Sequence, residues 1–386
     1  MMIIVINAVS LHISLRTSDD VSYSYNFKAR KRMKRQMLLL AALFMVGLGA
    51  WAQKAEQKFN PKKFQVFAVG FYNQENLFDT CHDAGKNDYE YLPAKGWNSE
   101  KYTSKLKNMS RALADMGTDV LPDAGCAFIG LAEVENANVL KDLTAQPPLK
   151  ARNMQFCHIE GPDKRGIDCA LLYNPALFTV KNVKLVPYVQ ELAKDSAFYT
   201  RGFLTVRGEM AGDDVAVIVC HWPSRFSDSF YRESGARQTK AVKDSLLRLN
   251  PEMKVFVMGD MNDDPTNKSM HEVLRAQPEI SEVGEGDMYN PWYNILAKEE
   301  KGTLYYRGKW NLFDQIVLTP NLLNKDGKKK GYSTLKFWKP QVFRRDYLLQ
   351  QDGPYKGAPL RTKAGGKWLN GYSDHLPVVM YLVKKK

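Results

Sequence analysis

The residues of this chain that could do chemistry are Asp, Asn, Glu and His side chains at the borders of apolar segments. The densest group is Gly259–Asp263, directly after the apolar segment Lys254–Met258. Asp260 and Asn262 are two positions apart, so on an extended chain they point to the same face. A carboxylate beside an amide can bind a hard cation or hold a water and a phosphate. A simple turn is the alternative, because Asn and Asp are common turn residues.

Two histidines also border apolar segments. His221 follows Val215–Cys220 and precedes Trp-Pro-Ser-Arg, a combination that suits a phosphate oxyanion. The triplet Ser-Asp-His at 373–375 precedes the apolar segment Leu376–Val383. An adjacent Asp and His can hold a protonated imidazole next to an anionic substrate. The alternatives are a structural histidine at 221 and a surface turn at 373–375.

Glu133 ends a third apolar segment, and a carboxylate at a strand end is a good Mg²⁺ ligand. The neighbouring Glu135 or Asn136 can instead cap a following helix. Asn73 and Asp314 are further polar residues beside apolar segments. The sequence contains no nucleophile-elbow serine, no His-Glu-x-x-His motif and no cysteine pair with ligand spacing. The remaining set suits metal-assisted attack of water on a phosphoester.

The elements that must position these side chains are strand-like segments rich in Val, Ile, Phe and Leu. They are Phe64–Phe71, Ala127–Ala132, Cys169–Tyr173, Val215–Cys220, Lys254–Met258, Gln315–Leu318 and Val378–Val383. One helix is predicted from an N-cap at Ser99 to Gly117, and a second ends before Pro251. Strands and helices interleave, so we expect a mixed α/β fold with one site at one rim of a sheet.

Composition narrows the class of protein. The chain has 386 residues, of which 44% are hydrophobic and 25% charged, and this excludes disordered, collagen-like and disulfide-dense chains. Its length allows a full core. No Gly-x-Gly-x-x-Gly or Walker loop occurs, so nucleotide-cofactor folds lack support.

The first 52 residues have the pattern of a secretory signal. Residues 28–35 are basic, an apolar run extends from Met37 to Trp51, and Ala-Trp-Ala at 50–52 offers a cleavage site. We expect Met33 to be the true start, and an exported, periplasmic or extracellular protein without a transmembrane span in the mature chain. An uncleaved anchor is the alternative, although the run is short for a span. Without the seven basic and two acidic residues of 1–52, totals of 55 and 42 become 48 and 40, a net charge of +8.

Cys157 and Cys169 flank a turn around Gly161-Pro162-Asp163. Counting outward from Asp163 places them opposite each other on a hairpin. They could form a cross-strand disulfide or remain two buried free thiols.

The ordered set of polar residues resembles the endonuclease/exonuclease/phosphatase superfamily. That family includes pancreatic deoxyribonuclease, abasic-site endonucleases, sphingomyelinases and inositol-phosphate 5-phosphatases. The resemblance covers roughly residues 64–383, and three further blocks (His-Trp-Pro-Ser-Arg, Gly-Thr-Leu-Tyr-Tyr and Gly-Tyr-Ser-Asp-His) resemble a secreted bacterial branch. The residues that carry it are Asn73, Glu133, His221, Asp260, Asn262, Asp314, Asp374 and His375.

The resemblance implies a four-layer αββα sandwich. Two mostly antiparallel sheets would pack face to face with helices outside, and the site would lie at one edge. The chain would then divide into an upstream extension with the signal peptide (1–52), a short N-terminal tail (53–63) and a single catalytic domain (64–386).

The resemblance also implies roles in metal binding and water activation. Glu133 would bind Mg²⁺ or Mn²⁺ with Asn73 beside it, and Asp374 would be a further metal or histidine partner. Asp260 would orient or activate the attacking water, and Asn262 would hold a phosphate oxygen.

The remaining implied roles concern the phosphate. His375 would stabilise the charged transition state, and His221 would stabilise the phosphate or protonate the leaving oxygen, with Asp314 supporting the network. Asp168 and Tyr173 are carried over as catalytic from the strand beside the site. Pairing of Asp168 with Arg165 in a buried hairpin is an equal alternative.

Nucleic acid is the first choice of substrate, because a net charge of +8 suits a polyanion. We expect Ser224, Arg225 and Arg237 to contact it, and the alternative is that they are ordinary residues of a helix surface. Tyr305, Tyr306 and Trp310 could stack on bases or simply pack. Arg344, Arg345 and Arg361 could belong to the substrate rim or to a solvated surface.

Two other functions remain open. A phosphatase or phospholipid phosphodiesterase would use the same catalytic set on a phosphorylated small molecule or a lipid. A catalytically inactive binding protein is disfavoured, because no catalytic position is missing. We expect a monomer.

Overall fold

The computed structural model describes residues 59–60, 62–192, 199–299, 301–327 and 329–386. Residues Asn60–Lys386 form one compact unit. The predicted signal peptide at 1–52 and most of the predicted tail lie outside the described residues. Among the described residues, no helix is both long enough and apolar enough to cross a bilayer.

One sheet has six strands in a mixed arrangement. Its order is β14-β17-β1-β2-β4-β3, and only the β1–β2 pair is parallel. The strands are β1 (Phe64–Leu77), β2 (Phe128–Val134), β3 (Gln155–His158), β4 (Asp168–Tyr173), β14 (Lys336–Val342) and β17 (Val378–Lys385).

The second sheet has seven strands in the order β5-β6-β7-β8-β13-β10-β9. The pairs β7–β8 and β9–β10 are parallel and the others antiparallel. The strands are β5 (Thr179–Val186), β6 (Phe203–Met210), β7 (Asp213–His221), β8 (Lys254–Asp260), β9 (Ala276–Gln277), β10 (Met288–Tyr289) and β13 (Asp314–Leu318). Two small hairpins pair β11 (Leu304–Tyr306) with β12 (Lys309–Asn311) and β15 (Lys363–Ala364) with β16 (Lys367–Trp368).

Helices connect and cover the sheets. The α-helices are α2 (Ser99–Asp115), α3 (Ala137–Ala145), α4 (Pro147–Ala151), α5 (Ser229–Leu249) and α6 (Trp292–Glu299). Short 3-10 helices lie at Tyr89–Tyr91, Pro93–Lys95, Ile280–Glu282, Pro320–Leu322, Lys329–Ser333 and Asp346–Leu348, and a π-helical turn at Ser269–Val273. The predicted cap of α2 shifts by one residue, because the Asn98 side chain accepts the Lys101 N–H at 3.0 Å.

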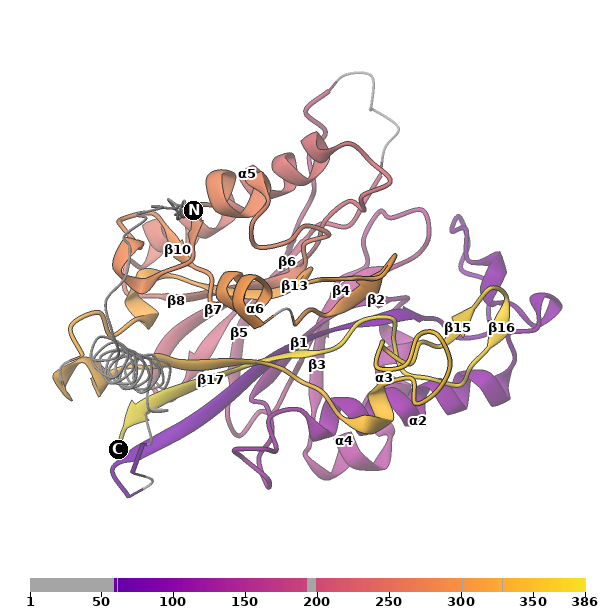
Figure 1. Cartoon of the computed structure of the whole chain (residues 1–386), viewed down its shortest axis with the longest axis horizontal. Helices are drawn as coiled ribbons and strands as arrows, with labels where there is room; N and C mark the ends of the chain where they lie inside the picture. Colours follow the sequence, from indigo (N-terminus) through magenta and orange to yellow (C-terminus); the bar gives the residue numbers. More distant parts are fainter. Residues whose placement is uncertain (1–58, 61, 193–198, 300, 328) are drawn as a thin grey trace, which may run out of the picture. The chain divides into compact units, whose positions relative to one another are not determined.

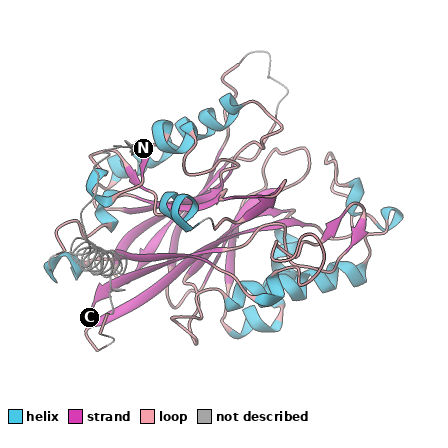
Figure 2. Cartoon of the chain, in the orientation of Figure 1, coloured by secondary structure: helices cyan, strands magenta, loops and turns pink. Residues whose placement is uncertain are grey.

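Helices lie outside the two sheets (Figures 1 and 2), and three hydrophobic cores lie between the resulting four layers. Between the sheets, Val69 and Phe71 of β1 pack with Val217 and Val219 of β7. A second core lies between the six-stranded sheet and α2 and α3, and a third between the seven-stranded sheet and α5. Alternation along β1 supplies two of these cores, because neighbouring side chains point to opposite faces. The predicted αββα sandwich with mostly antiparallel sheets is confirmed.

The cysteines correct one expectation. All five are free, and Cys157 lies opposite Leu171 rather than Cys169. Cys157 and Cys169 are both buried in the core between the sheets. The hairpin is centred on Lys164 rather than on Asp163, so the two thiols do not face each other.

Candidate active site

Strand direction brings the polar residues to one edge of the sandwich. The parallel pair β1–β2 delivers Asn73 and Glu133 near the ends of both strands, and the parallel pair β7–β8 places His221 directly opposite Asp260. A Cβ at Gly259 would clash with the Cys220 carbonyl oxygen, so β7 and β8 approach closely just before these residues. The antiparallel strand β13 then brings Asp314 opposite Asp260 at its own beginning.

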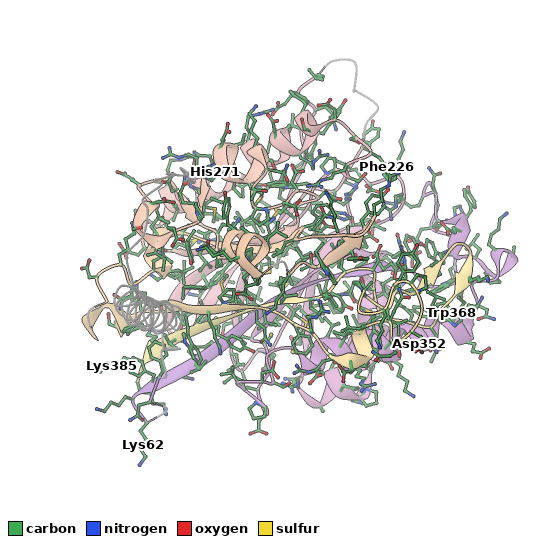
Figure 3. The ribbon with its side chains drawn as sticks, in the orientation of Figure 1. Lys62, Phe226, His271, Asp352, Trp368 and Lys385 are labelled. Carbon is green, nitrogen blue, oxygen red and sulfur yellow. The ribbon has the colours of Figure 1, made fainter. Side chains whose placement is uncertain are left out.

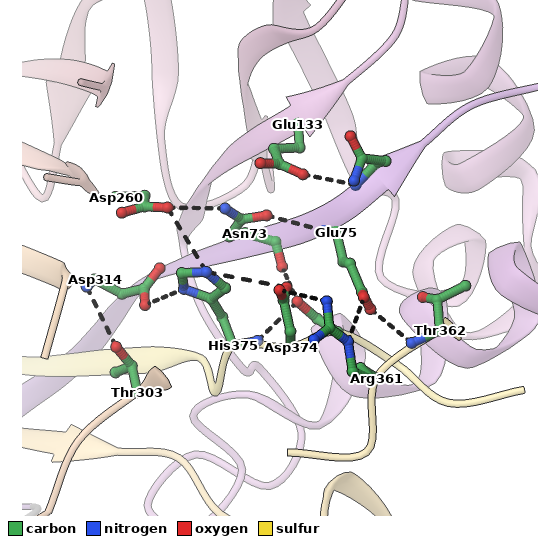
Figure 4. Close-up of polar contacts among 12 residues, drawn as sticks. Asn73, Glu75, Glu133, Asp260, Thr303, Asp314, Arg361, Thr362, Asp374 and His375 are labelled. Carbon is green, nitrogen blue, oxygen red and sulfur yellow. Dashed lines mark hydrogen bonds and ion pairs between the residues drawn. The ribbon is translucent and has the colours of Figure 1, made fainter. Parts of the chain in front are cut away.

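Asp260 is the centre of the cluster (Figure 4). Its Oδ2 accepts a hydrogen bond from Asn73 Nδ2 at 3.0 Å, and Nε2 of His221 and of His375 lie 3.7 and 3.8 Å from the same oxygen. Its Oδ1 accepts the Asn262 N–H at 2.9 Å. Burial raises the pKa of Asp260 to about 6, with Asp314 raising it and His375 opposing the rise. Asp260 can therefore act as a base near neutral pH.

His375 forms a tight pair with Asp314. Its Nδ1 lies 2.6 Å from Asp314 Oδ2, and both side chains are buried. Burial alone would lower the pKa of His375, but the carboxylates of Asp314 and Asp260 outweigh it and raise that pKa well above its usual value. The loop before β17 holds the ring in place, since Ser373 Oγ accepts the His375 N–H at 3.1 Å and donates to the Asn73 carbonyl at 2.8 Å. The surroundings of His375 therefore favour its charged form.

His221 has the opposite character. Burial lowers its pKa well below the usual value, and the positive charges of Arg201, Arg165 and His375 lower it further. Its Nδ1 is buried without a hydrogen-bond partner among the described residues. Its Nε2 faces two carboxylate oxygens, Asp260 Oδ2 at 3.7 Å and Glu133 Oε1 at 3.9 Å. A neutral ring with its hydrogen on Nε2 fits these surroundings.

Glu133 has the position and the free oxygen that a metal ligand needs. Its backbone is left-handed, with φ of 61°, and it lines the cleft. Its Oε2 accepts the Asn76 N–H at 2.9 Å, whereas no hydrogen bond to Oε1 occurs among the described residues. Two positive φ values, at Glu75 and Asn76, mark the irregular end of β1 that permits this contact. An oxygen without a donor in a wet cleft fits a hard cation that keeps several waters.

A second arrangement of ligand atoms fits a cation less well. Asp260, Asp314 and His375 each offer one atom within 4.8 Å of the others. An ion there would break the 2.6 Å contact between His375 Nδ1 and Asp314 Oδ2. Glu133 is therefore the better anchor.

The carboxylate of Asp374 forms an ion pair with an arginine. Its Oδ2 receives Arg361 Nη2 at 3.0 Å, while its Oδ1 lies 4.0 Å from His375 Nε2. Arg361 Nε also donates to Glu75 Oε1 at 3.0 Å, and Glu75 Oε2 accepts the Thr362 N–H at 2.6 Å. Glu75 was not among the predicted site residues. Arg361 therefore bridges the carboxylates of Asp374 and Glu75, and this ion pairing leaves Asp374 poorly suited as a metal ligand.

The other predicted arginines divide into those that line the cleft and those that contact other parts of the protein. Of the three with an open assignment, Arg361 lines the cleft, Arg344 stacks over Trp310, and Arg345 pairs with Asp115 and Asp119. Arg165 also lines the cleft, 3.7 Å from Glu133 Oε2, and was missed as a site residue.

Three predicted site residues make their contacts outside the Asp260 cluster, although Asp168 lies opposite Val134, at the same edge as Glu133. Tyr173 is at the opposite end of β4, opposite Phe128, and its hydroxyl donates to Gln155 at 3.0 Å. Asp168 is bound to His158 Nε2 at 3.0 Å and to the Gly161 N–H at 3.0 Å, not to Arg165.

Arg237 lies on α5 and pairs with Glu191 at 2.5 Å. Arg237 is not among the described residues that line the cleft, so its placement does not support the predicted contact with substrate. Tyr173 lies at the far end of β4, whereas Asp168 lies at the same edge as Glu133 with both of its side-chain oxygens engaged.

A cleft of about 1520 Å³ lies over the cluster. Ser224 and Arg225 line it as predicted, but Arg225 is fixed by hydrogen bonds to residues on two other segments, including Asp264 at 3.0 Å and Asn311 at 3.2 Å. The basic lining residues are Lys164, Arg165, Arg201, Arg225, Arg307, Arg361 and Lys367. The aromatic ones are Tyr199, Phe226, Tyr305, Tyr306, Phe313 and Tyr355.

Of the aromatic residues predicted to stack on bases, one is exposed and two pack on each other. Tyr306 is 55% exposed at the cleft, whereas Tyr305 and Trp310 pack on each other with ring centroids 5.2 Å apart. Phe226, which was not predicted, is fully exposed at the cleft rim on the loop after β7 (Figure 3). Nothing in its local sequence distinguishes it from a packed aromatic.

The solved structures that match this structure have low sequence identity to this chain. An endonuclease/exonuclease/phosphatase family protein from Bacteroides thetaiotaomicron is 14% identical, over 83% of this chain and 96% of that one, with a TM-score of 0.49. A mannosyl-6-phosphatase from the same species is 14% identical, over 82% and 99%, with a TM-score of 0.48. D. rerio TDP2, complexed with a single-strand DNA product, is 12% identical, over 82% and 98%, with a TM-score of 0.48.

The sequence comparisons identify the family directly. A search of curated proteins gives no match. The family model described as Endonuclease/Exonuclease/phosphatase family matches residues 68–384, nearly all of the compact unit. The chain therefore belongs to the endonuclease/exonuclease/phosphatase family, and it is a hydrolytic phosphoesterase.

Proposed function

We propose that this protein is an exported, divalent-metal-dependent phosphodiesterase that hydrolyses DNA or RNA. The observation that carries the proposal is the cleft over Asp260, which combines basic walls with the exposed rings of Tyr306 and Phe226. Cations bind a phosphate backbone, and exposed rings stack on bases with little sequence preference.

Glu133, with Asn73 beside it, would hold Mg²⁺ or Mn²⁺. When bound, the ion neutralises charge on the phosphate and stabilises the charge that develops in the transition state. Asn73 also orients Asp260 through the 3.0 Å hydrogen bond, so Oδ2 of Asp260 is available to take a proton from the attacking water.

His375 and His221 would act on the phosphate as two different donors. The imidazolium of His375, held by Asp314, supplies positive charge and a hydrogen bond from Nε2. Neutral His221 supplies a hydrogen bond from Nε2 to a phosphate oxygen or to the leaving oxygen. Preorganised donors of this kind typically contribute about 3–4 kcal/mol each to transition-state stabilisation.

Asn262 would contribute one amide hydrogen. Its Nδ2 donates to the Trp222 carbonyl at 2.9 Å, and an amide nitrogen has two hydrogens, so the second is available for a phosphate oxygen. Its left-handed backbone, with φ of 50°, fixes the side chain at the cleft. Asp374 would act through Arg361 rather than as a metal ligand.

A substrate panel tests the proposal. The purified protein is assayed on plasmid DNA, single-stranded DNA, RNA, sphingomyelin, an inositol polyphosphate and bis-nitrophenyl phosphate, with Mg²⁺, Mn²⁺ or EDTA. Metal-dependent cleavage of DNA or RNA is expected. Tyr173→Phe is the matched control, since that hydroxyl lies at the far end of β4. Turnover confined to the lipid or the inositol phosphate would keep the mechanism and replace the substrate.

Export and oligomeric state have separate tests. The basic and apolar segments at 28–52 support export with cleavage after Ala52. Mass spectrometry of the protein recovered from a secreting bacterial host should give Gln53 as the first residue. Light scattering during gel filtration should give a monomer.

Removing either exposed ring should weaken binding of nucleic acid. We expect Tyr306→Ala and Phe226→Ala each to raise KM for a single-stranded oligonucleotide by about 5- to 150-fold, with kcat nearly unchanged, because base stacking contributes about 1–3 kcal/mol per base. Steady-state kinetics measure both constants. Leu249→Ala, at an exposed apolar residue ending α5, is the control. An unchanged KM in both ring variants would exclude stacking on these side chains.

A further inference from the structure

The guanidinium of Arg361 uses only one of its two faces for contacts within the protein. Its Nε donates to Glu75 Oε1 at 3.0 Å, and its Nη2 donates to Asp374 Oδ2 at 3.0 Å. Nε and Nη2 share one side of the planar group, so these contacts leave the end face, which is formed by Nη1 and the second hydrogen of Nη2. In the part of the chain that the structure describes, Nη1 has no hydrogen bond or ion pair.

Arg361 lies in the cleft beside the Asp260 cluster. It lines the cleft together with Glu133, Asp260 and His375, and its side chain is 41% exposed. Figure 4 shows Arg361 next to Asp374, whose other carboxylate oxygen lies 4.0 Å from His375 Nε2. One carboxylate therefore separates the guanidinium from the imidazole that we propose as a phosphate donor. An exposed end face at this place is available to an oxygen of a bound phosphate.

The other arginines of the cleft are held differently. Arg201 uses both Nη atoms within the protein, toward a carboxylate and a backbone carbonyl at 3.1 Å each. Arg225 uses Nε and both Nη atoms. The Arg165 side chain is held, among the described residues, through Nη2 alone. Arg361 is thus both fixed by two carboxylates and left with an open fork.

A fully buried lysine supports the segment that carries Arg361. Lys105 on α2 is 0% exposed, and its Nζ donates to Thr362 Oγ1 at 2.5 Å and to the Tyr372 carbonyl oxygen. Thr362 Oγ1 in turn donates to the Tyr372 carbonyl at 3.2 Å, which closes the base of the loop that contains the β15–β16 hairpin. Arg361 directly precedes this loop, and Asp374 follows it by two residues. Because a buried ammonium is costly without such contacts, Lys105 fixes both ends of the loop.

Glu75 completes this support from the end of β1. Its side chain is 6% exposed, and while Oε1 receives Arg361, Oε2 accepts the Thr362 N–H at 2.6 Å. Lys105 and Arg361 are the cations that act on its charge. Glu75 is not among the described residues that line the cleft, so any effect it has on a substrate passes through Arg361.

We propose that Arg361 binds the substrate phosphate through the free end of its guanidinium, and that Glu75 and Lys105 position it for this contact. A planar fork matches two phosphate oxygens, and an arginine keeps its charge at every pH at which the enzyme works. The inference rests on the proposed function only in placing the phosphate in the cleft over Asp260, so it applies to any phosphoester bound there.

Steady-state kinetics test the contact. Arg361→Ala should lower kcat/KM by about 10- to 150-fold on whichever phosphoester of the panel the wild type hydrolyses, the range for a lost hydrogen bond to a charged group. Arg361→Lys should recover only part of this loss, because an ammonium is a point charge without the fork. Arg248→Ala, at an exposed arginine of α5, is the matched control and should behave as wild type. Turnover of a lipid or an inositol phosphate alone would contradict nucleic acid as the substrate and would leave this comparison in force.

Two further measurements separate contact with phosphate from a structural role. Millimolar guanidinium should restore part of the activity of Arg361→Ala, whereas urea or NaCl at the same concentration should not, because only a planar cation replaces the lost group. Calorimetry with inorganic phosphate as the probe needs no turnover, and it should give a Kd at least about 10-fold higher in Arg361→Ala but unchanged in Arg248→Ala. A wild-type Kd for phosphate in Arg361→Ala, or a kcat/KM within about threefold of wild type, would overturn the inference.

The positioning roles have a test of their own. Glu75→Gln and Lys105→Met should each lower kcat/KM, yet cause little further loss when added to Arg361→Ala, because residues that act through one group are not additive. Losses that multiply in the double variants would give Glu75 or Lys105 an independent role and would contradict positioning. Thermal unfolding checks that each variant is folded, and Glu75→Gln decides the question if Lys105→Met does not fold.

Discussion

Replacing Asp260 with asparagine is expected to lower kcat on the preferred phosphodiester by about 10²–10⁴-fold, the usual contribution of a positioned general base. The substitution keeps the shape of the side chain and removes its charge. Among the described residues, Asp260 is the one carboxylate whose oxygen lies within 4 Å of both His221 and His375 and accepts the Asn73 amide. Its raised pKa, about 6, matches a base that works near neutral pH.

The comparison needs a folded variant and a matched control. Asp123→Asn makes the same chemical change at an exposed position in the loop between α2 and β2, and should retain wild-type kcat. Thermal unfolding should show that Asp260→Asn keeps its fold. A kcat within about threefold of wild type would assign proton removal to a group other than Asp260.

The position of the cluster follows from features that a sequence reveals. Apolar segments that end in Asn73, Glu133, His221 or Asp260 become buried strands, and the helices between β1 and β2 and between β7 and β8 make each pair parallel. Parallel strands joined by a helix end at the same edge. The sandwich and the convergence of these side chains could therefore be predicted from spacing and resemblance.

Strand direction explains where the same reasoning failed. Tyr173 and Asp168 bound one strand, but β4 runs antiparallel to β2, so Tyr173 lies at the edge away from Glu133. The sequence shows that both residues border an apolar run, not which border faces the site. The edge strand β5 was not recognised, because most of its side chains are only partly buried and its apolar pattern is weak.

Residues on irregular segments could not be placed at all. Arg361 reaches Glu75 across 286 positions of the chain, from a stretch with no periodicity. Loop side chains depend on backbone turns that carry little pattern in the sequence, and binding residues are often found on such loops. The sequence does not predict Phe226 and Arg165 as site residues for the same reason, although both line the cleft.

Replacing Asp314 with asparagine is expected to lower kcat by up to about 10⁴-fold, the loss typical of a buried carboxylate that orients a catalytic histidine and stabilises its charge. The carboxylate lies 2.6 Å from His375 Nδ1 and is fully buried. Burial lowers the pKa of His375, and without the charge of Asp314 the main group that still raises it is Asp260. The pKa of His375 therefore falls in the variant. The ring loses both its fixed orientation and part of its charge.

The pH dependence of this loss reveals which form of His375 acts. An imidazolium is present only below its pKa. If it is the active form, the activity of Asp314→Asn relative to wild type should fall as pH rises through the lowered pKa. A neutral His375 acting as a base would instead make the rate of Asp314→Asn itself rise as pH passes through the lowered pKa, because deprotonation supplies the active form. His375→Gln cannot titrate at this position, so adding Asp314→Asn to it should cause little further loss at any pH. Rate profiles of the two single variants and the double variant therefore separate electrostatic stabilisation by the pair from proton removal by the ring.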